Sequence, residues 1–90
     1  MEIPYCWVSR HDYADFRFAC VDGDSMPADY EAWMAGLDKF VEGLRARGMT
    51  PVQINIKPQA FADWCDEQGI AIDADGRIKY AAFCRRKAIR

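Results

Sequence analysis

The feature that most constrains the fold is a stripe of apolar side chains between Pro27 and Gly48. Its members recur at steps of three and four: Tyr30, Trp33, Met34, Leu37, Phe40, Val41 and Leu44. That spacing puts them on one side of a helix, and an apolar side needs a partner surface. Pro27 suits a first helical turn and Gly48 suits a helix end, so the sequence predicts one long helix over Pro27–Arg47.

Three other segments predict the small sheet against which this helix would pack. Ile3–Ser9 is aromatic and β-branched, and Pro4 marks it as an edge strand because proline has no N–H to donate. After a polar turn at Arg10–Asp15, the alternation in Phe16–Val21 predicts a second strand that forms a hairpin with the first. Apolar and polar residues also alternate in Val52–Lys57, which predicts a strand with one buried face.

The C-terminal third predicts one further helix and leaves a second element open. Pro58 would open a short helix that Gly69 closes, with Phe61, Trp64 and Cys65 on one side. Beyond it, the Asp-Gly pair before Arg77 favours a hairpin within Ile70–Tyr80. Alternatively, Asp73 caps a last helix, which the alanines and the basic residues near the C-terminus favour.

These elements together predict the fold class. The expected fold is a single α+β domain over residues 1–90. A three-stranded sheet, mixed or antiparallel, is packed by one long helix in the order β-β-α-β-α-(α).

Charge is unevenly distributed although the net charge is only −2, which gives no global attraction to nucleic acid or anionic lipid. No acidic residue follows Gly76, whereas that segment contains these basic residues: Arg77, Lys79, Arg85, Arg86, Lys87 and Arg90. On a helix they could contact phosphates, with Tyr80 and Phe83 stacking on bases. They could equally complement the helix dipole or an acidic body. Nucleic-acid association is therefore an alternative hypothesis.

The residue types that usually carry chemistry are sparsely placed. The four cysteines lie far apart, without a C-x-x-C pair, at Cys6, Cys20, Cys65 and Cys84. This spacing predicts buried, reduced thiols in place of a zinc site or a disulfide. The aspartates of Asp73–Gly76 lack two oxygen donors of a calcium loop, and those of Asp22–Asp24 precede a helix N-terminus, so both clusters are expected to serve turns and caps.

The single histidine, His11, sits beside Asp12 in a predicted turn, where a solvated role is expected. We therefore expect no catalytic residue, no metal and no cofactor. An aromatic pocket that uses His11 or a cysteine for a small ligand or for catalysis is a second alternative. The N-terminus lacks the pattern of a signal peptide, and no apolar run approaches the roughly 18 residues of a membrane span, so a cytoplasmic protein is expected.

Aromatic residues give the main functional prediction. Five Phe, four Tyr and three Trp are many for the core of so short a chain. Trp33 and Trp64 are expected in that core. A surface patch for a partner chain would contain the remaining candidates, Tyr5, Trp7, Tyr13 and Tyr30. Because an edge strand with exposed aromatics invites pairing with a second copy, the sequence predicts a non-catalytic protein-binding module that forms a homodimer.

One stretch supports a resemblance. Phe61, Trp64 and Cys65, followed by Gly69 and by the Arg77-x-x-Tyr80-Ala81 motif, resemble the C-terminal half of short bacterial and phage-associated proteins. The resemblance covers about a quarter of the chain. It implies a mobile-element or accessory-gene origin and assigns no site residues.

Overall fold

The computed structural model describes residues 1–88 and contains two strands and four helices. Strands β1 (Glu2–Trp7) and β2 (Thr50–Asn55) pair in parallel, with Glu2 opposite Thr50 and Trp7 opposite Asn55. The helices are α1 (Tyr13–Ala19), α2 (Tyr30–Ala46), α3 (Pro58–Gln68) and α4 (Ala74–Ala88). Two 3-10 turns, at Arg10–Asp12 and Gly23–Ser25, flank α1.

The predicted three-stranded sheet is wrong, because the sheet has only two strands and they are parallel; the broader α+β class holds. The expected strand over Phe16–Val21 is helix α1 with the residues that follow it. Tyr13, Phe16 and Cys20 are buried at a helical spacing, whereas Phe18 is 92% exposed. The short alternation in this segment fits both the two-residue period of a strand and the 3.6-residue period of a helix. The buried Tyr13, three residues before Phe16, fits only the helical period.

The long helix is confirmed, although it begins at Tyr30 and not at Pro27. Asp29 is its N-cap, and the Asp29 carboxylate accepts a hydrogen bond from the backbone N–H of Glu31 at 3.3 Å. After the helix ends, Gly48 adopts a positive φ of 79° that favours glycine.

The remaining elements follow the sequence closely. β2 is confirmed, starting and ending two residues earlier than predicted. Helix α3 ends at Gly69, whose φ of 67° lies in the left-handed region. Asp73 accepts a hydrogen bond from the N–H of Gly76 at 3.0 Å and caps α4. The helical alternative for the C-terminal segment is therefore confirmed, and the hairpin alternative is wrong.

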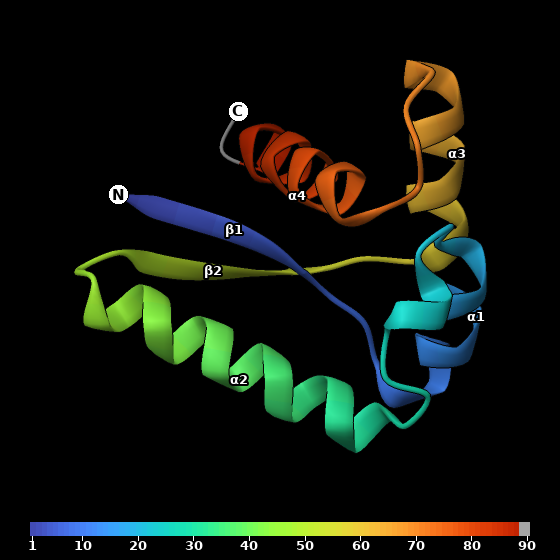
Figure 1. The fold of residues 1–90 in the computed structure, drawn as a ribbon. Helices are drawn as coiled ribbons and strands as arrows, with labels where there is room; N and C mark the ends of the chain where they lie inside the picture. The colour runs from blue at the N-terminus through green and yellow to red at the C-terminus, as the bar shows by residue number, and fades with distance from the viewer. Residues whose placement is uncertain (89–90) are drawn as a thin grey trace.

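The two-stranded sheet lies between helices. Helix α4 covers one face and α2 lies on the other side, while α1 and α3 gather beyond the ends of the strands (Figure 1). The side chains of β1 alternate between these helices. Tyr5 points toward α2 and packs edge-on against Phe40, with ring centroids 6.3 Å apart. Cys6 points toward α4, where its thiol donates to the carbonyl oxygen of Arg77 at 3.2 Å.

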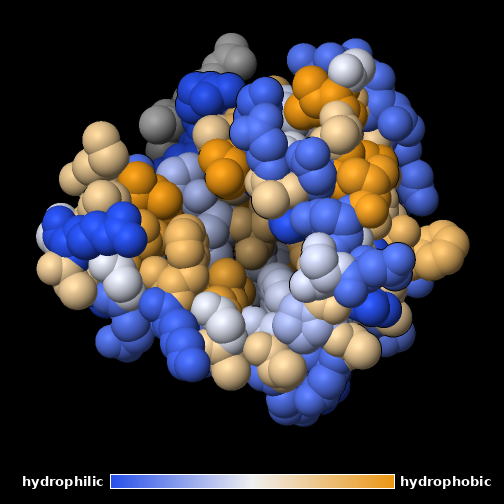
Figure 2. All heavy atoms as spheres, viewed as in Figure 1, coloured by the Kyte–Doolittle hydropathy of each residue, from blue (hydrophilic) through white to orange (hydrophobic). Residues whose placement is uncertain are grey.

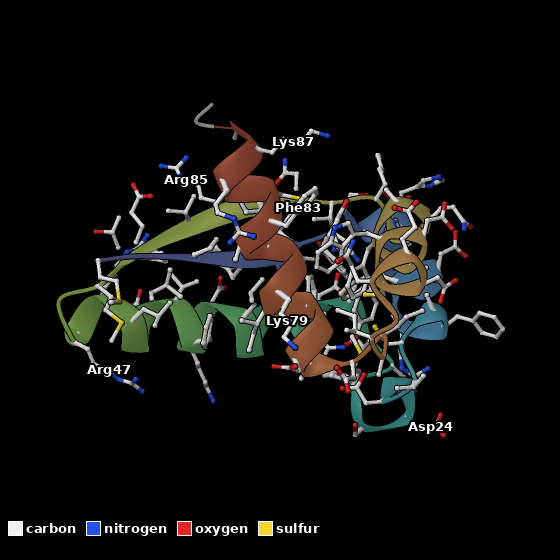
Figure 3. All side chains as sticks on the ribbon, turned by 90° about the horizontal axis from the view of Figure 1, so that it is seen from above. Asp24, Arg47, Lys79, Phe83, Arg85 and Lys87 are labelled. Carbon is white, nitrogen blue, oxygen red and sulfur yellow. The ribbon has the colours of Figure 1, made fainter. Side chains whose placement is uncertain are left out.

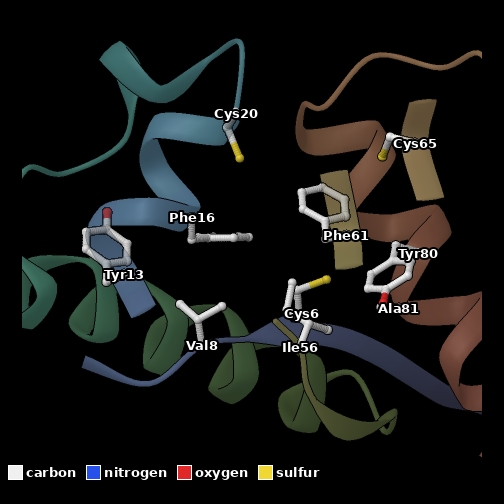
Figure 4. Packing of buried hydrophobic residues seen from close by; sticks show 10 residues of the cluster. All are labelled: Cys6, Val8, Tyr13, Phe16, Cys20, Ile56, Phe61, Cys65, Tyr80 and Ala81. Atoms are coloured by element: carbon white, nitrogen blue, oxygen red, sulfur yellow. The ribbon is translucent and has the colours of Figure 1, made fainter. Parts of the chain in front are cut away.

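The buried hydrophobic cluster is built mainly from α1, α3 and α4. Phe16 and Phe61 are completely buried, and their ring centroids are 5.9 Å apart at the centre of this region (Figure 4). Trp33 and Trp64, expected in the core, are only partly buried and pack against its margin. Within residues 1–88, no helix combines the length and the apolar character that crossing a membrane requires.

Candidate functional site

Strand β1 has a free backbone edge. The N–H of Thr50 donates to the carbonyl of Met1 at 2.8 Å, and the N–H of Ile56 donates to the carbonyl of Trp7 at 3.0 Å. The backbone groups of the odd-numbered residues of β1 therefore point toward β2 and bond to it. Because backbone direction alternates along a strand, the N–H and C=O groups of the even-numbered residues, Glu2, Pro4 and Cys6, point away from β2. Pro4 lacks its N–H on the unpaired side, which confirms the predicted edge strand.

A groove runs along this free edge between α2 and α4, with a volume of about 450 Å³. Figure 2 looks onto it and shows the surface hollowed between the two helices. No residue of β2 lines it. Its lining comes from β1, α1, α2 and α4: Ile3, Pro4, Tyr5, Cys6, Phe16, Trp33, Leu37, Phe40, Ala74, Arg77 and Ile78. We call this feature the edge groove.

The walls of the edge groove are apolar and accessible. Phe40 on α2 is 48% exposed, and Ile78 on α4 is 66% exposed. Among the apolar stripe of α2, only Val41 and Leu44 are buried. The two-stranded sheet is too narrow to cover the whole stripe, and the remainder of the stripe forms a wall of the edge groove.

Among residues 1–88, the only charged side chain that lines the edge groove is already paired. The Arg77 guanidinium donates to both carboxylate oxygens of Asp22, at 3.0 and 2.9 Å, and to the thiol of Cys20 at 3.2 Å. These charge-assisted bonds hold the pKa of Asp22 below its usual value. The edge groove therefore offers an occupant apolar side chains and unpaired backbone groups, without a free charge along its length.

The two ends of the edge groove carry opposite charges. Arg47 lies toward the N-terminal end of β1, whereas Asp24 lies at the opposite end (Figure 3). Arg85 is held by Glu2 of β1, at 3.0 and 2.9 Å. Asp75, in the first turn of α4, adds no free charge there because it is paired with Lys79 at 2.9 Å.

Only one residue of the predicted aromatic patch lines the edge groove, namely Tyr5. Trp7 and Tyr30 are half-buried, and the Tyr30 hydroxyl donates to the carbonyl of Val8 at 3.1 Å. Tyr13 is 3% exposed and belongs to the core, so it presents no surface to a partner.

Sequence reasoning missed Trp33, Leu37, Phe40 and Ile78 as site residues. The available signal was the length of the apolar stripe, which exceeds what a small sheet can cover. Ile78 carried no such signal, because its position depends on how α4 crosses β1.

The predicted phosphate contacts are largely engaged with carboxylates. Arg77 pairs with Asp22 and Arg85 with Glu2, and Lys79 pairs with Asp75 at 2.9 Å. Arg86 and Lys87 are exposed and form no ion pair within residues 1–88. The last predicted contact, Arg90, lies outside the described residues.

Of the candidate reactive groups, His11 and the four cysteines, only Cys6 lines the edge groove. His11 is exposed on the turn before α1 and does not line the edge groove. Cys6 does line it, but burial raises the pKa of its thiol to about 12, so the thiol stays protonated and weakly nucleophilic. Cys20 and Cys65 are also buried and Cys84 is half-buried; all four are free. The described part of the chain contains no His, Cys, Asp or Glu cluster suited to a metal ion.

The fold and the groove define a small α+β protein with a parallel two-stranded sheet and an open strand edge. Comparisons with protein-family models, curated proteins and solved structures find no match for this chain.

Proposed function

We propose that the chain is a non-catalytic module that binds a segment of another protein in the edge groove. The observation that carries the proposal is an apolar hollow along a free strand edge, with accessible Phe40 and Ile78 on opposite walls. Exposed apolar side chains around such a hollow are typical of protein-binding surfaces.

The chemistry of the lining favours a protein segment over a metabolite. Small-molecule sites combine apolar walls with a few converging polar side chains that orient the ligand. The polar side chains of the edge groove are those of Arg77, which is occupied by Asp22, of Cys6, whose thiol donates to the Arg77 carbonyl, and of Tyr5. Besides the Tyr5 hydroxyl, the groups left for an occupant are backbone N–H and C=O groups of β1, which match the backbone of another polypeptide.

Nucleic-acid binding has less support. Phosphate contacts need cations that are free to replace counterions. Arg77, Lys79 and Arg85 are each paired with a carboxylate, and the net charge of the chain is −2. The homodimer expected from the sequence remains a prediction, and a second copy is a competing occupant of the edge groove.

A displayed library of random twelve-residue peptides tests the proposal. Peptides selected on the wild-type protein are titrated against Ile78→Glu and against Phe18→Glu. Both positions are exposed and apolar, at 66% and 92%, and Phe18 lies away from the edge groove on α1, which makes it a matched control.

We expect Ile78→Glu to weaken peptide binding at least tenfold and Phe18→Glu to leave it unchanged. Selected peptides that bind both variants equally well, or the absence of any selected peptide, would contradict the proposal.

A further inference from the structure

We propose that the bound segment enters the edge groove as an extended strand and adds to β1 as a third strand of the sheet. This inference rests on the proposed function and goes beyond it, since it states the conformation and the charge pattern of the ligand.

The floor of the edge groove is a row of unpaired backbone groups. The pairing of β1 with β2 leaves the N–H groups of Glu2 and Cys6, and the carbonyls of Glu2, Pro4 and Cys6, directed away from β2. An extended peptide supplies complementary groups at the same spacing. A helical ligand cannot, because its own backbone groups are already bonded within the helix.

The walls fix the side chains of such a strand. Successive residues of an added strand would point alternately toward α2 and toward α4. Leu37 and Phe40 line the groove on α2, and Ala74 and Ile78 line it on α4. Both faces of the added strand are covered, as in a buried parallel sheet, so its central residues should form a continuous apolar run. Because β1 has six residues, this run spans about five.

The charges at the two ends give the ligand a polarity. Arg47 lies toward the N-terminal end of β1, and Asp24 lies at the other end (Figure 3). A complementary segment carries acidic residues on the flank beside Arg47, and basic residues on the flank beside Asp24. Such a segment is a different polypeptide, with an apolar centre and oppositely charged flanks.

The same geometry disfavours a second copy of this chain. In the view from above, α2 lies toward the free-edge side of β1 and not directly beneath the sheet (Figure 3). Paired strands lie about 4.8 Å apart, whereas packed helices need roughly 8–10 Å between axes. Two copies joined through β1 would therefore bring their α2 helices into the same space, while a single strand fits between α2 and α4.

An N-methyl scan of a selected peptide tests strand addition. In an added strand only every second amide points at β1, so methylation should weaken binding roughly five- to tenfold at alternate residues and little at the residues between. In parallel, Arg47→Glu should weaken binding several-fold at low salt. The matched control is Arg10→Glu, which lies outside the edge groove.

The outcomes separate this inference from the proposed function. Selected peptides with apolar residues at steps of three and four, and without alternation in the scan, would overturn strand addition and leave the protein-binding groove standing. A dimer in sedimentation that Ile78→Glu dissociates would make a second copy the occupant and would also overturn the inference. Selected peptides without opposite charges on their flanks would contradict the charge pattern. Binding that is insensitive to Ile78→Glu would overturn both proposals.

Discussion

The two sides of β1 show how differently one strand can be used. Toward α4, α1 and α3, its side chains join a core in which Phe16 and Phe61 are fully buried. Toward its free edge and α2, Tyr5 meets Phe40, which remains half exposed. The difference teaches that aromatic content alone does not distinguish core from binding surface. Whether a residue is buried depends on how many strands the sheet supplies to cover it.

The largest expected effect separates two phenylalanines of α1. Phe16→Ala removes a completely buried ring and should lower the free energy of unfolding by about 3–5 kcal/mol. Phe18→Ala, at the exposed face of the same helix, should change it by no more than about 0.5 kcal/mol. Urea unfolding measures both, and Phe16→Leu serves if the alanine variant does not fold. Similar losses at the two positions would contradict the packing described here.

The Arg77–Asp22 pair connects the edge groove to the core and should contribute next. Asp22→Asn should lower the free energy of unfolding by about 1.5–3 kcal/mol at pH 7, because it removes a charge-assisted pair. Asp75→Asn breaks the exposed pair with Lys79 and should cost less than about 1 kcal/mol.

The pH dependence of this difference has a definite sign. Arg77 lowers the pKa of Asp22 in the folded state. The stabilisation of the fold by this pair is therefore complete above 3.8, the ordinary pKa of the aspartate carboxyl. It is lost as the pH falls through the lower folded-state pKa. The wild type and Asp22→Asn should therefore converge in stability once the pH falls below the folded-state pKa of Asp22. A constant difference across this range would rule out the pair as its cause.

Two glycines distinguish the tight and open regions again. An alanine Cβ at Gly76, in the first turn of α4, would lie 2.5 Å from the carbonyl oxygen of Ala71. Gly76→Ala should therefore destabilise the fold by about 1–3 kcal/mol. At Gly36 in α2 the added methyl would meet nothing within 4 Å, so Gly36→Ala should stabilise by about 0.5–1 kcal/mol. Thermal unfolding of the two variants should shift in opposite directions, and a common direction would contradict the packing at Gly76.

The smallest effect on stability is expected in the edge groove itself. Ile78→Glu replaces an exposed side chain, so the free energy of unfolding should change by no more than about 0.5 kcal/mol even though peptide binding is lost. A large destabilisation, measured by urea unfolding, would show that Ile78 packs as a core residue and would weaken the proposed role of the groove.

The sequence predicted the elements that have long patterns or strong punctuation. Three patterns were each sufficient to predict an element: the apolar stripe predicted α2, the alternation predicted β2, and Pro58 and Gly69 marked the two ends of α3. The pattern of Phe16–Val21 was not sufficient to predict its element, because an alternation of only six residues fits a strand and a helix equally well. That one error added a strand to the sheet.

The extra strand would have occupied the space where the edge groove lies. Pro4 correctly indicated a free edge, but the wall formed by Phe40 and Ile78 depends on how α2 and α4 cross β1. Such crossing is set by packing between distant parts of the chain, which local patterns do not encode.

Amide hydrogen exchange along β1 of the free protein tests the central claim most directly. In the proposed geometry, the amides of Tyr5 and Trp7 are bonded to β2, whereas the amide of Cys6 faces the edge groove without a partner. The account predicts that Cys6 exchanges at least about tenfold faster than Tyr5 and Trp7. Equal protection at all three residues would mean that the edge is already covered, and would contradict it.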